Sequence, residues 1–193
     1  MYFGHNGEVQ MSNVPAPNHV MIDLETMAIQ PEAAIVSIGA VVFDPRTGKV
    51  GNEGTKQTFY SELEWEFQGR LIDPSTEAWW LKQSKHARNA LNGLDDLGES
   101  LVSLVNWLPQ DAKVWGNGSI FDIAMLEHAY RQLDIDIPWK FWNVRDCRTI
   151  KDLYESSRGG WDKKAGGNAH NALHDAIYQA QYISTMWNKI LKP

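Results

Sequence analysis

The sequence is poor in cysteine, in basic residues and in long apolar runs. Its single cysteine, Cys147, cannot form a disulfide within the chain, so we expect a reducing, cytoplasmic environment. The longest apolar run, residues 33–43, is far shorter than the roughly 20 residues of a membrane helix, so no membrane span is predicted. The 18 Lys and Arg against 24 Asp and Glu give a net charge of −6, unlike proteins that coat nucleic acid through its phosphates.

What remains is the composition of one globular domain. Hydrophobic residues make up 43 % of the 193 residues and charged residues 22 %, which excludes a disordered or collagen-like chain. Residues 1–18 carry no periodic apolar pattern and lack the features of a signal peptide, so we expect a flexible N-terminal arm. No repeat or linker interrupts the rest, and we therefore expect a single domain over residues 19–193.

Apolar periodicity predicts a mixed α/β fold. Strands are expected over 19–24, 33–43, 55–61 and 112–115 and within 141–146, the second and third pairing as an antiparallel hairpin. Helices are expected over 75–91 with Ser75 as N-cap, 97–108, 120–133 with Ser119 as N-cap, from 147 to Tyr154, and 171–190. A Gly-rich loop is expected over 155–169. Strands followed by alternating helices and strands favour a mixed sheet covered by helices.

Two carboxylates end the first predicted strand. Asp23 and Glu25 are two residues apart, so their side chains point to the same face of that strand. Ligand-binding clefts form at strand ends in α/β sheets, and a divalent cation such as Mg²⁺ or Mn²⁺ relieves the repulsion between two close carboxylates. The alternative is a pair of solvent-exposed acids without a ligand.

Further acidic and histidine positions follow later in the chain. Asp122 lies in the first turn of a predicted helix, where an acid also simply complements the helix dipole. His170 and Asp175 flank the start of the last helix, and His170 with His174 has the spacing of a zinc pair. A metalloprotease would need Glu directly after the first histidine, where this sequence has Asn171.

The order of these motifs resembles the DEDDh 3′–5′ exonucleases of the ribonuclease H-like superfamily. Residues 22–26 and 35–43 are similar to the first two strands of that family, 117–122 to its second motif, and 170–175 to its third. The Trp79–Trp80 pair is most similar to the small branch that contains phage exonuclease A. The resemblance implies an α/β ribonuclease H-like fold, with a mixed five-stranded sheet flanked by helices on both faces.

The resemblance also implies a chemistry. The expected activity is metal-dependent 3′–5′ exonucleolytic hydrolysis of single-stranded nucleic acid, with two divalent ions, Mg²⁺ or Mn²⁺. Asp23, Glu25 and Asp175 would hold one ion, Asp23 would also contact the second, and Asp122 would act partly through water. His170 would be the general base, a role that suits a side chain with a near-neutral pKa.

Other residues are assigned to the substrate. By the same resemblance, Leu24, Thr26 and Met27 would contact the terminal nucleotide, although Met27 equally suits a buried position. The Gly-rich loop supplies a candidate stacking residue and candidate phosphate contacts, although a solvated loop explains them as well; they are Trp161, Arg158, Lys163 and Lys164. The sequence leaves open DNA against RNA, and whether the chain forms a homodimer.

Two alternative functions belong to other classes. The first is a nucleic-acid-binding module of ribonuclease H-like fold without catalysis. The presence of Asp23, Glu25, Asp122, Asp175 and His170 argues against this module, because a relic is expected to lose some of them. The second is a zinc hydrolase, which would retain stoichiometric zinc through its histidines.

Overall fold

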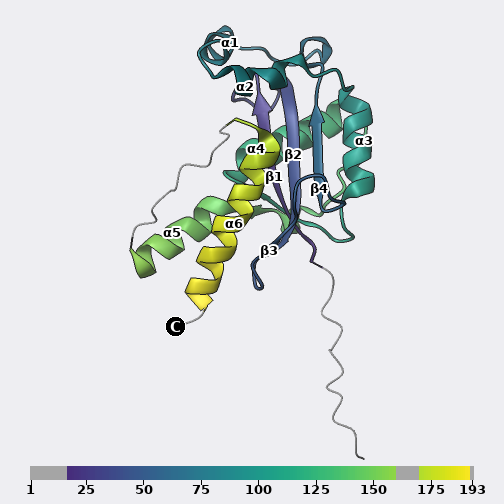
Figure 1. Ribbon diagram of the computed structural model, residues 1–193. Helices are drawn as coiled ribbons and strands as arrows, with labels where there is room; N and C mark the ends of the chain where they lie inside the picture. The colour runs from purple at the N-terminus through teal and green to yellow at the C-terminus, as the bar shows by residue number, and fades with distance from the viewer. Residues whose placement is uncertain (1–16, 160–169, 192–193) are drawn as a thin grey trace, which may run out of the picture.

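The computed structural model describes residues 17–159 and 170–191, arranged as a central sheet with helices around it (Figure 1). Most of the expected N-terminal arm, residues 1–18, lies outside these ranges, as do Trp161, Lys163 and Lys164. None of the described helices is long and apolar enough to cross a lipid bilayer.

Over the described ranges the sheet has six strands rather than the expected five, in the order β3-β2-β1-β5-β6 with β4 also paired to β2. The strands are β1 (His19–Thr26), β2 (Ile35–Asp44), β3 (Lys49–Val50), β4 (Thr58–Glu62), β5 (Lys113–Gly116) and β6 (Arg145–Asp146). The short strand β3 arises because the chain turns tightly after β2 and pairs with Phe43 and Asp44 before it leaves the sheet. The antiparallel pairing of β2 with β4 confirms the predicted hairpin, and parallel pairing of β1 with β5 makes the sheet mixed.

Helices cover both faces of this sheet, as expected. They are α1 (Pro74–Trp80), α2 (Lys85–Arg88), α3 (Leu97–Trp107), α4 (Ser119–Gln132), α5 (Cys147–Arg158) and α6 (Ala172–Leu191). The described ranges also contain three 3₁₀ turns: η1 (Trp65–Phe67) between β4 and α1, η2 (Asn89–Asn92) after α2, and η3 (Phe141–Asn143) between α4 and β6.

The alternation of β1 assigns each of its side chains to one face. Val20, Ile22 and Leu24 point into a core formed with Leu101, Leu104 and Leu126 of α3 and α4. Met21 points the other way, into a core with residues of α5 and α6, namely Cys147, Ala176, Ala180 and Ile183. Because successive strand residues alternate, the intervening acids Asp23 and Glu25 lie on the α6 face. Figure 1 shows α6 crossing β1 and β2 on that face.

The expected helix over 75–91 is divided in the structure. Pro74 occupies the first helical position, so the cap is Asp73, whose carboxylate accepts the Ser75 N–H at 2.7 Å, rather than Ser75. The first helix ends at Trp80, and Ser84 starts a second helix by accepting the Ala87 N–H at 3.1 Å. Apolar spacing alone did not reveal this break, because both pieces bury residues in one cluster around Trp80.

Two further boundaries differ from the expectation. Helix α4 begins at Ser119 with Gly118, not Ser119, as its cap, because Gly118 has a φ of 109° and the Ser119 N–H donates to Asp146 of β6. Helix α5 continues through Arg158, so residues 155–158 of the expected loop are helical.

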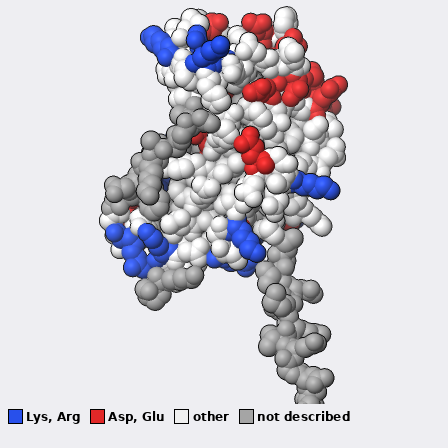
Figure 2. All heavy atoms as spheres, viewed as in Figure 1, with Lys and Arg blue, Asp and Glu red and all other residues white. Residues whose placement is uncertain are grey.

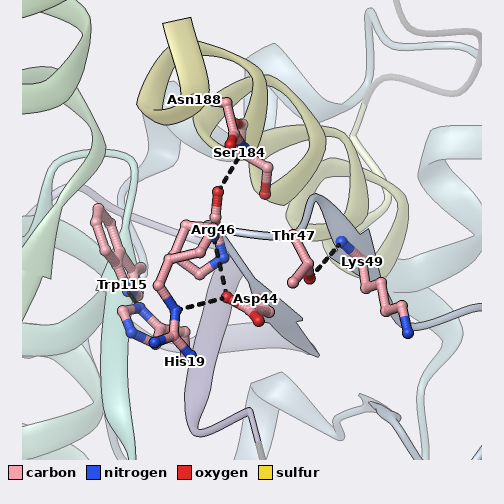
Figure 3. Close-up of polar contacts among 9 residues, drawn as sticks. His19, Asp44, Arg46, Thr47, Lys49, Trp115, Ser184 and Asn188 are labelled. Atoms are coloured by element: carbon pink, nitrogen blue, oxygen red, sulfur yellow. Dashed lines mark hydrogen bonds and ion pairs between the residues drawn. The ribbon is translucent and has the colours of Figure 1, made fainter. Parts of the chain in front are cut away.

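Helix α6 contacts β2 near its start and the turn that follows β2 near its end. Near its end, the Asn188 Nδ2 donates to the backbone oxygen of Pro45 at 2.8 Å, in the turn after β2 (Figure 3). That turn is ordered by Asp44, whose carboxylate accepts the backbone N–H of Arg46 at 3.0 Å. At its start, α6 approaches Gly39 of β2 so closely that a Cβ there would lie 2.1 Å from the carbonyl carbon of Ala172.

We therefore expect Gly39→Ala to displace the start of α6. The substitution should cost about 3 kcal/mol of unfolding free energy, the upper part of the range for overpacking, because backbone atoms must move. Urea denaturation measures this loss. Gly54→Ala is the control, since its Cβ meets nothing within 4 Å, and it should lose only about 1 kcal/mol from left-handed backbone strain. Equal losses for the two variants would contradict the predicted clash.

Candidate active site

Three carboxylates from two distant segments meet beside β1. One oxygen from each of Asp23, Glu25 and Asp175 lies within 4.8 Å of the others. Asp23 and Glu25 come from consecutive positions on one face of β1, and Asp175 comes from the first turn of α6. The helix N-terminus favours a carboxylate there, whereas the β1 acids gain no such compensation. The structure thus brings together three of the four predicted acids in one cluster.

The fourth acid, Asp122, lies next to this cluster and is held by the main chain of β1. Its Oδ1 accepts the backbone N–H of Leu24 at 3.2 Å, and the residue is 3 % exposed. Gly116 at the end of β5 leaves room for the carboxylate, because a Cβ there would lie 3.0 Å from its Oδ2. Asp122 therefore connects the start of α4 with the end of β1.

Burial and mutual repulsion disfavour the charged forms of these acids. Burial, Asp175 and Asp122 together raise the pKa of Glu25 to about 8. The pKa of Asp23 is raised well above its usual range, first by burial and then by Asp122 and Glu25. Burial also raises the pKa of Asp122 to about 7, although backbone N–H groups, including that of Leu24, oppose the shift. Within the described part of the chain, burial and the neighbouring carboxylates therefore disfavour the state in which all of these acids are ionised.

His170 lies directly beside the cluster through its backbone. Its N–H donates to Asp175 Oδ2 at 3.0 Å, and its φ of 68° places it in the left-handed region. The imidazole packs edge-on against Trp79, with ring centroids 4.9 Å apart, and lies near Trp80. Trp80 in turn donates its Nε1–H to the backbone carbonyl oxygen of Thr26 at 3.1 Å, and this bond connects the aromatic pair to the end of β1.

His174 points away from the acid cluster. Its Nε2 lies 3.1 Å from the Glu53 carboxylate in the loop between β3 and β4. Asn171 accepts the His174 N–H at 3.0 Å and donates to the Tyr60 hydroxyl, which secures the start of α6 to β4. Among the described residues, neither histidine joins the group of three candidate ligands, so the zinc-pair interpretation gains no support.

The three residues expected to contact the terminal nucleotide are buried. Leu24 is 5 % exposed, Thr26 9 % and Met27 1 %. Met27 packs in the cluster around Trp80, as the alternative of a buried position predicts. Their contact with a nucleotide stays a prediction.

Sequence reasoning missed two residues next to the acids. Gln179 donates its amide to Asp23 Oδ1 at 2.7 Å, and its spacing of four residues from Asp175 could have indicated the shared helix face. Arg148 of α5 lies over Gly118, where its guanidinium carbon is 3.1 Å from an ideal Cβ position, and its charge partly opposes the rise that burial causes in the pKa of Asp122. No local pattern reveals Arg148, because the contact depends on how the start of α5 lies next to Gly118 in the folded chain.

Comparison with known proteins places this geometry in a family. The family model described as the 3′-5′ exoribonuclease Rv2179c-like domain matches residues 18–187. An exodeoxyribonuclease of Enterobacteria phage T4 is 27 % identical over 192 residues, which covers 80 % of this chain and 82 % of the relative.

Solved structures share the fold. E. coli Exonuclease I in complex with an oligonucleotide has a TM-score of 0.64 at 14 % identity and covers 91 % of this chain and 41 % of its own. S. pombe Pop2p, in its Mg²⁺- and Mn²⁺-bound form, has a TM-score of 0.58 at 16 % identity, with 88 % and 82 % covered. The nuclease domain of 3′hExo, a DEDDh family member bound to rAMP, has a TM-score of 0.57 at 14 % identity, with 89 % and 92 % covered.

The match to the family model includes every residue of the acid cluster. The relative from phage T4 covers most of the same chain and is also an exonuclease by name. The fold of the solved neighbours agrees with both findings. The chain belongs to the 3′-5′ exoribonuclease Rv2179c-like family and is a 3′-5′ exonuclease, a hydrolase of phosphodiester bonds.

Proposed function

We propose that this exonuclease removes nucleotides from the 3′ ends of single-stranded nucleic acid with two divalent cations held by its clustered acids, and that residues 19–193 form a single exonuclease domain. The observation that carries the proposal is the approach of Asp23, Glu25 and Asp175 to within 4.8 Å. Three carboxylates at this spacing repel one another, and a cation relieves that repulsion.

The donor set fits a hard divalent cation. All of the candidate ligands are carboxylate oxygens, which suit Mg²⁺ or Mn²⁺. Asp23, Glu25 and Asp175 would hold one ion, and Asp23 with the adjacent Asp122 would hold the second. When bound, such ions supply stabilisation of the negative charge that develops on the attacking and leaving oxygens of the phosphodiester.

The residues of the chain have separate roles in this proposal. A ring nitrogen of His170 accepts a proton from the attacking water, and Asp175 fixes the histidine through its backbone N–H. Trp79 and Trp80 limit the positions of the imidazole. Asp122 fixes the main chain of β1 at Leu24, which orients the neighbouring acids.

Single-stranded ends suit the surface charge. Acidic side chains gather over the upper part of the face in Figure 2, and basic ones form separate patches rather than a continuous track. A duplex would have to unpair its end before the terminal nucleotide could enter the site. The names of the relatives support both RNA and DNA as substrates, since the family is described as exoribonuclease and the phage protein as exodeoxyribonuclease.

The activity is tested with 5′-labelled single-stranded RNA, single-stranded DNA and blunt duplexes of the same sequence, with Mn²⁺ or with EDTA. We expect a ladder that shortens from the 3′ end, slower on duplexes, and absent in EDTA because the acids need a cation. Full activity in EDTA would contradict the cation requirement. Equal rates on duplex and single strand would contradict the single-strand preference.

The same assay tests whether activity requires the acid cluster or is equally sensitive to acids elsewhere on the surface. Asp23→Asn should abolish turnover while the circular dichroism spectrum and thermal midpoint remain those of a folded protein, because a carboxylate of the cluster is lost. Asp152→Asn, on the exposed surface of α5, should leave the rate unchanged. An active Asp23→Asn variant would exclude the proposed site.

The raised carboxyl pKa values predict how stability depends on pH. In EDTA, the folded chain holds the Glu25 proton up to about pH 8, whereas the unfolded chain releases it near 4.5. Stability should therefore fall between these pH values, by at most about 1.4 kcal/mol per pH unit for this one group. Urea denaturation of wild type and Glu25→Gln from pH 5 to 8 measures the effect, and the difference between them isolates Glu25 from other titrating groups. A difference that stays constant with pH would refute the shift.

The role of His170 is tested against His174. His170→Ala should lower kcat by about 10²- to 10⁴-fold, the usual contribution of a general base, and flatten the acidic limb of the pH–rate profile. Mn²⁺ binding should survive. His174→Ala is the matched control and should stay near wild type, because that ring contacts Glu53 instead. The reverse result would show that the base is assigned to the wrong histidine.

A further inference from the structure

Gln179 is a buried amide whose observed bond goes to the acid cluster. Its Nε2 donates to Asp23 Oδ1 at 2.7 Å, and the residue is 6 % exposed. It follows Asp175 by four residues on α6, so both side chains project from one face of that helix toward β1. One face of α6 thus supplies a carboxylate to the cluster and, one turn later, a donor to it.

Packing alone does not account for an amide at this position. The neighbouring buried residues of the helix are Ala176, Ala180 and Ile183, and they form an apolar core with β1 and β2. The Gln179 Oε1 is buried without a hydrogen-bond partner among the described residues. An apolar side chain would avoid that unfavourable burial. The bond to Asp23 is the interaction that an apolar replacement could not make.

The chemistry of the donor suits a carboxylate that binds a cation. A primary amide donates a hydrogen bond without carrying charge, so it can hold Oδ1 of Asp23 without competing with a divalent ion for the site. An Arg or Lys here would place a positive charge where the cation belongs. Hydrogen bonds to ligating carboxylates generally orient them, and their loss weakens metal affinity.

We infer that Gln179 is a positioning residue, whose amide fixes the carboxylate of Asp23 in the orientation that binds a divalent cation. The inference rests on the proposed function, because it requires a cation at Asp23, Glu25 and Asp175. Gln179 touches neither substrate nor reacting atoms in this role and acts through Asp23.

The inference is tested by calorimetric titration of Mn²⁺ into the metal-free full chain. Gln179→Met keeps a long unbranched side chain but removes the donor. It should weaken Mn²⁺ binding, raising the dissociation constant by about 10- to 100-fold. Gln181→Met, an exposed position on the same helix, should bind as wild type does. In the nuclease assay, raising the Mn²⁺ concentration should restore kcat of Gln179→Met, which a damaged fold would not allow.

Further variants keep the outcome decisive. If Gln179→Met does not fold, Gln179→Asn replaces it, since this side chain keeps the amide but is one methylene too short to reach Asp23. Wild-type Mn²⁺ affinity in a folded variant without the bond would overturn the inference. The Asp23→Asn variant distinguishes failure of the proposed cation site from failure of the role of Gln179. If Asp23→Asn also binds Mn²⁺ normally, the proposed cation site itself is wrong. If Asp23→Asn loses Mn²⁺ binding while the Gln179 variant binds Mn²⁺ normally, only the role of Gln179 is refuted.

Discussion

The close packing of α6 against β2 is the contact on which the rest of the site depends. Because Gly39 has no side chain, the first turn of α6 rests against the backbone of β2, directly beside the strand that carries Asp23. Asp175 can reach the acids of β1 only from this position. The apolar residues of α6 hold the helix there against the repulsion between the carboxylates that its approach creates.

The aromatic and histidine residues form a second support around the end of β1. Trp80 bonds the Thr26 oxygen, and its neighbour Trp79 packs against the ring of His170. His170 also donates its backbone N–H to Asp175. The end of β1, the start of α6 and the helix α1 are thereby joined around the acids, although they are far apart in the sequence.

Features that depend on local periodicity could be predicted from the sequence. The two-residue spacing of Asp23 and Glu25 correctly predicted that they share a face, and the apolar pattern located the long strands and α6. Features that depend on packing between segments could not. Asp146 of β6 accepts the Ser119 N–H at the start of α4, although the two residues are far apart in the sequence. The break after Trp80 is hidden because both pieces of the expected helix bury apolar residues. The contact of Gln179 with Asp23 likewise exists only once α6 is docked.

The acid cluster joins the first strand to the last helix of the fold. Glu25 and Asp175 are separated by 150 residues along the chain (175 − 25), so their meeting is a contact of very high sequence separation. Contacts of such high separation are associated with slow folding, because the entropy of closing the loop is lost before the contact stabilises the chain. A partly folded chain, with α6 detached from the sheet, therefore carries only the two acids of β1 and no complete cluster. The connectivity of the chain therefore makes the complete acid cluster a property of the finished tertiary structure, which no isolated segment of the chain can reproduce.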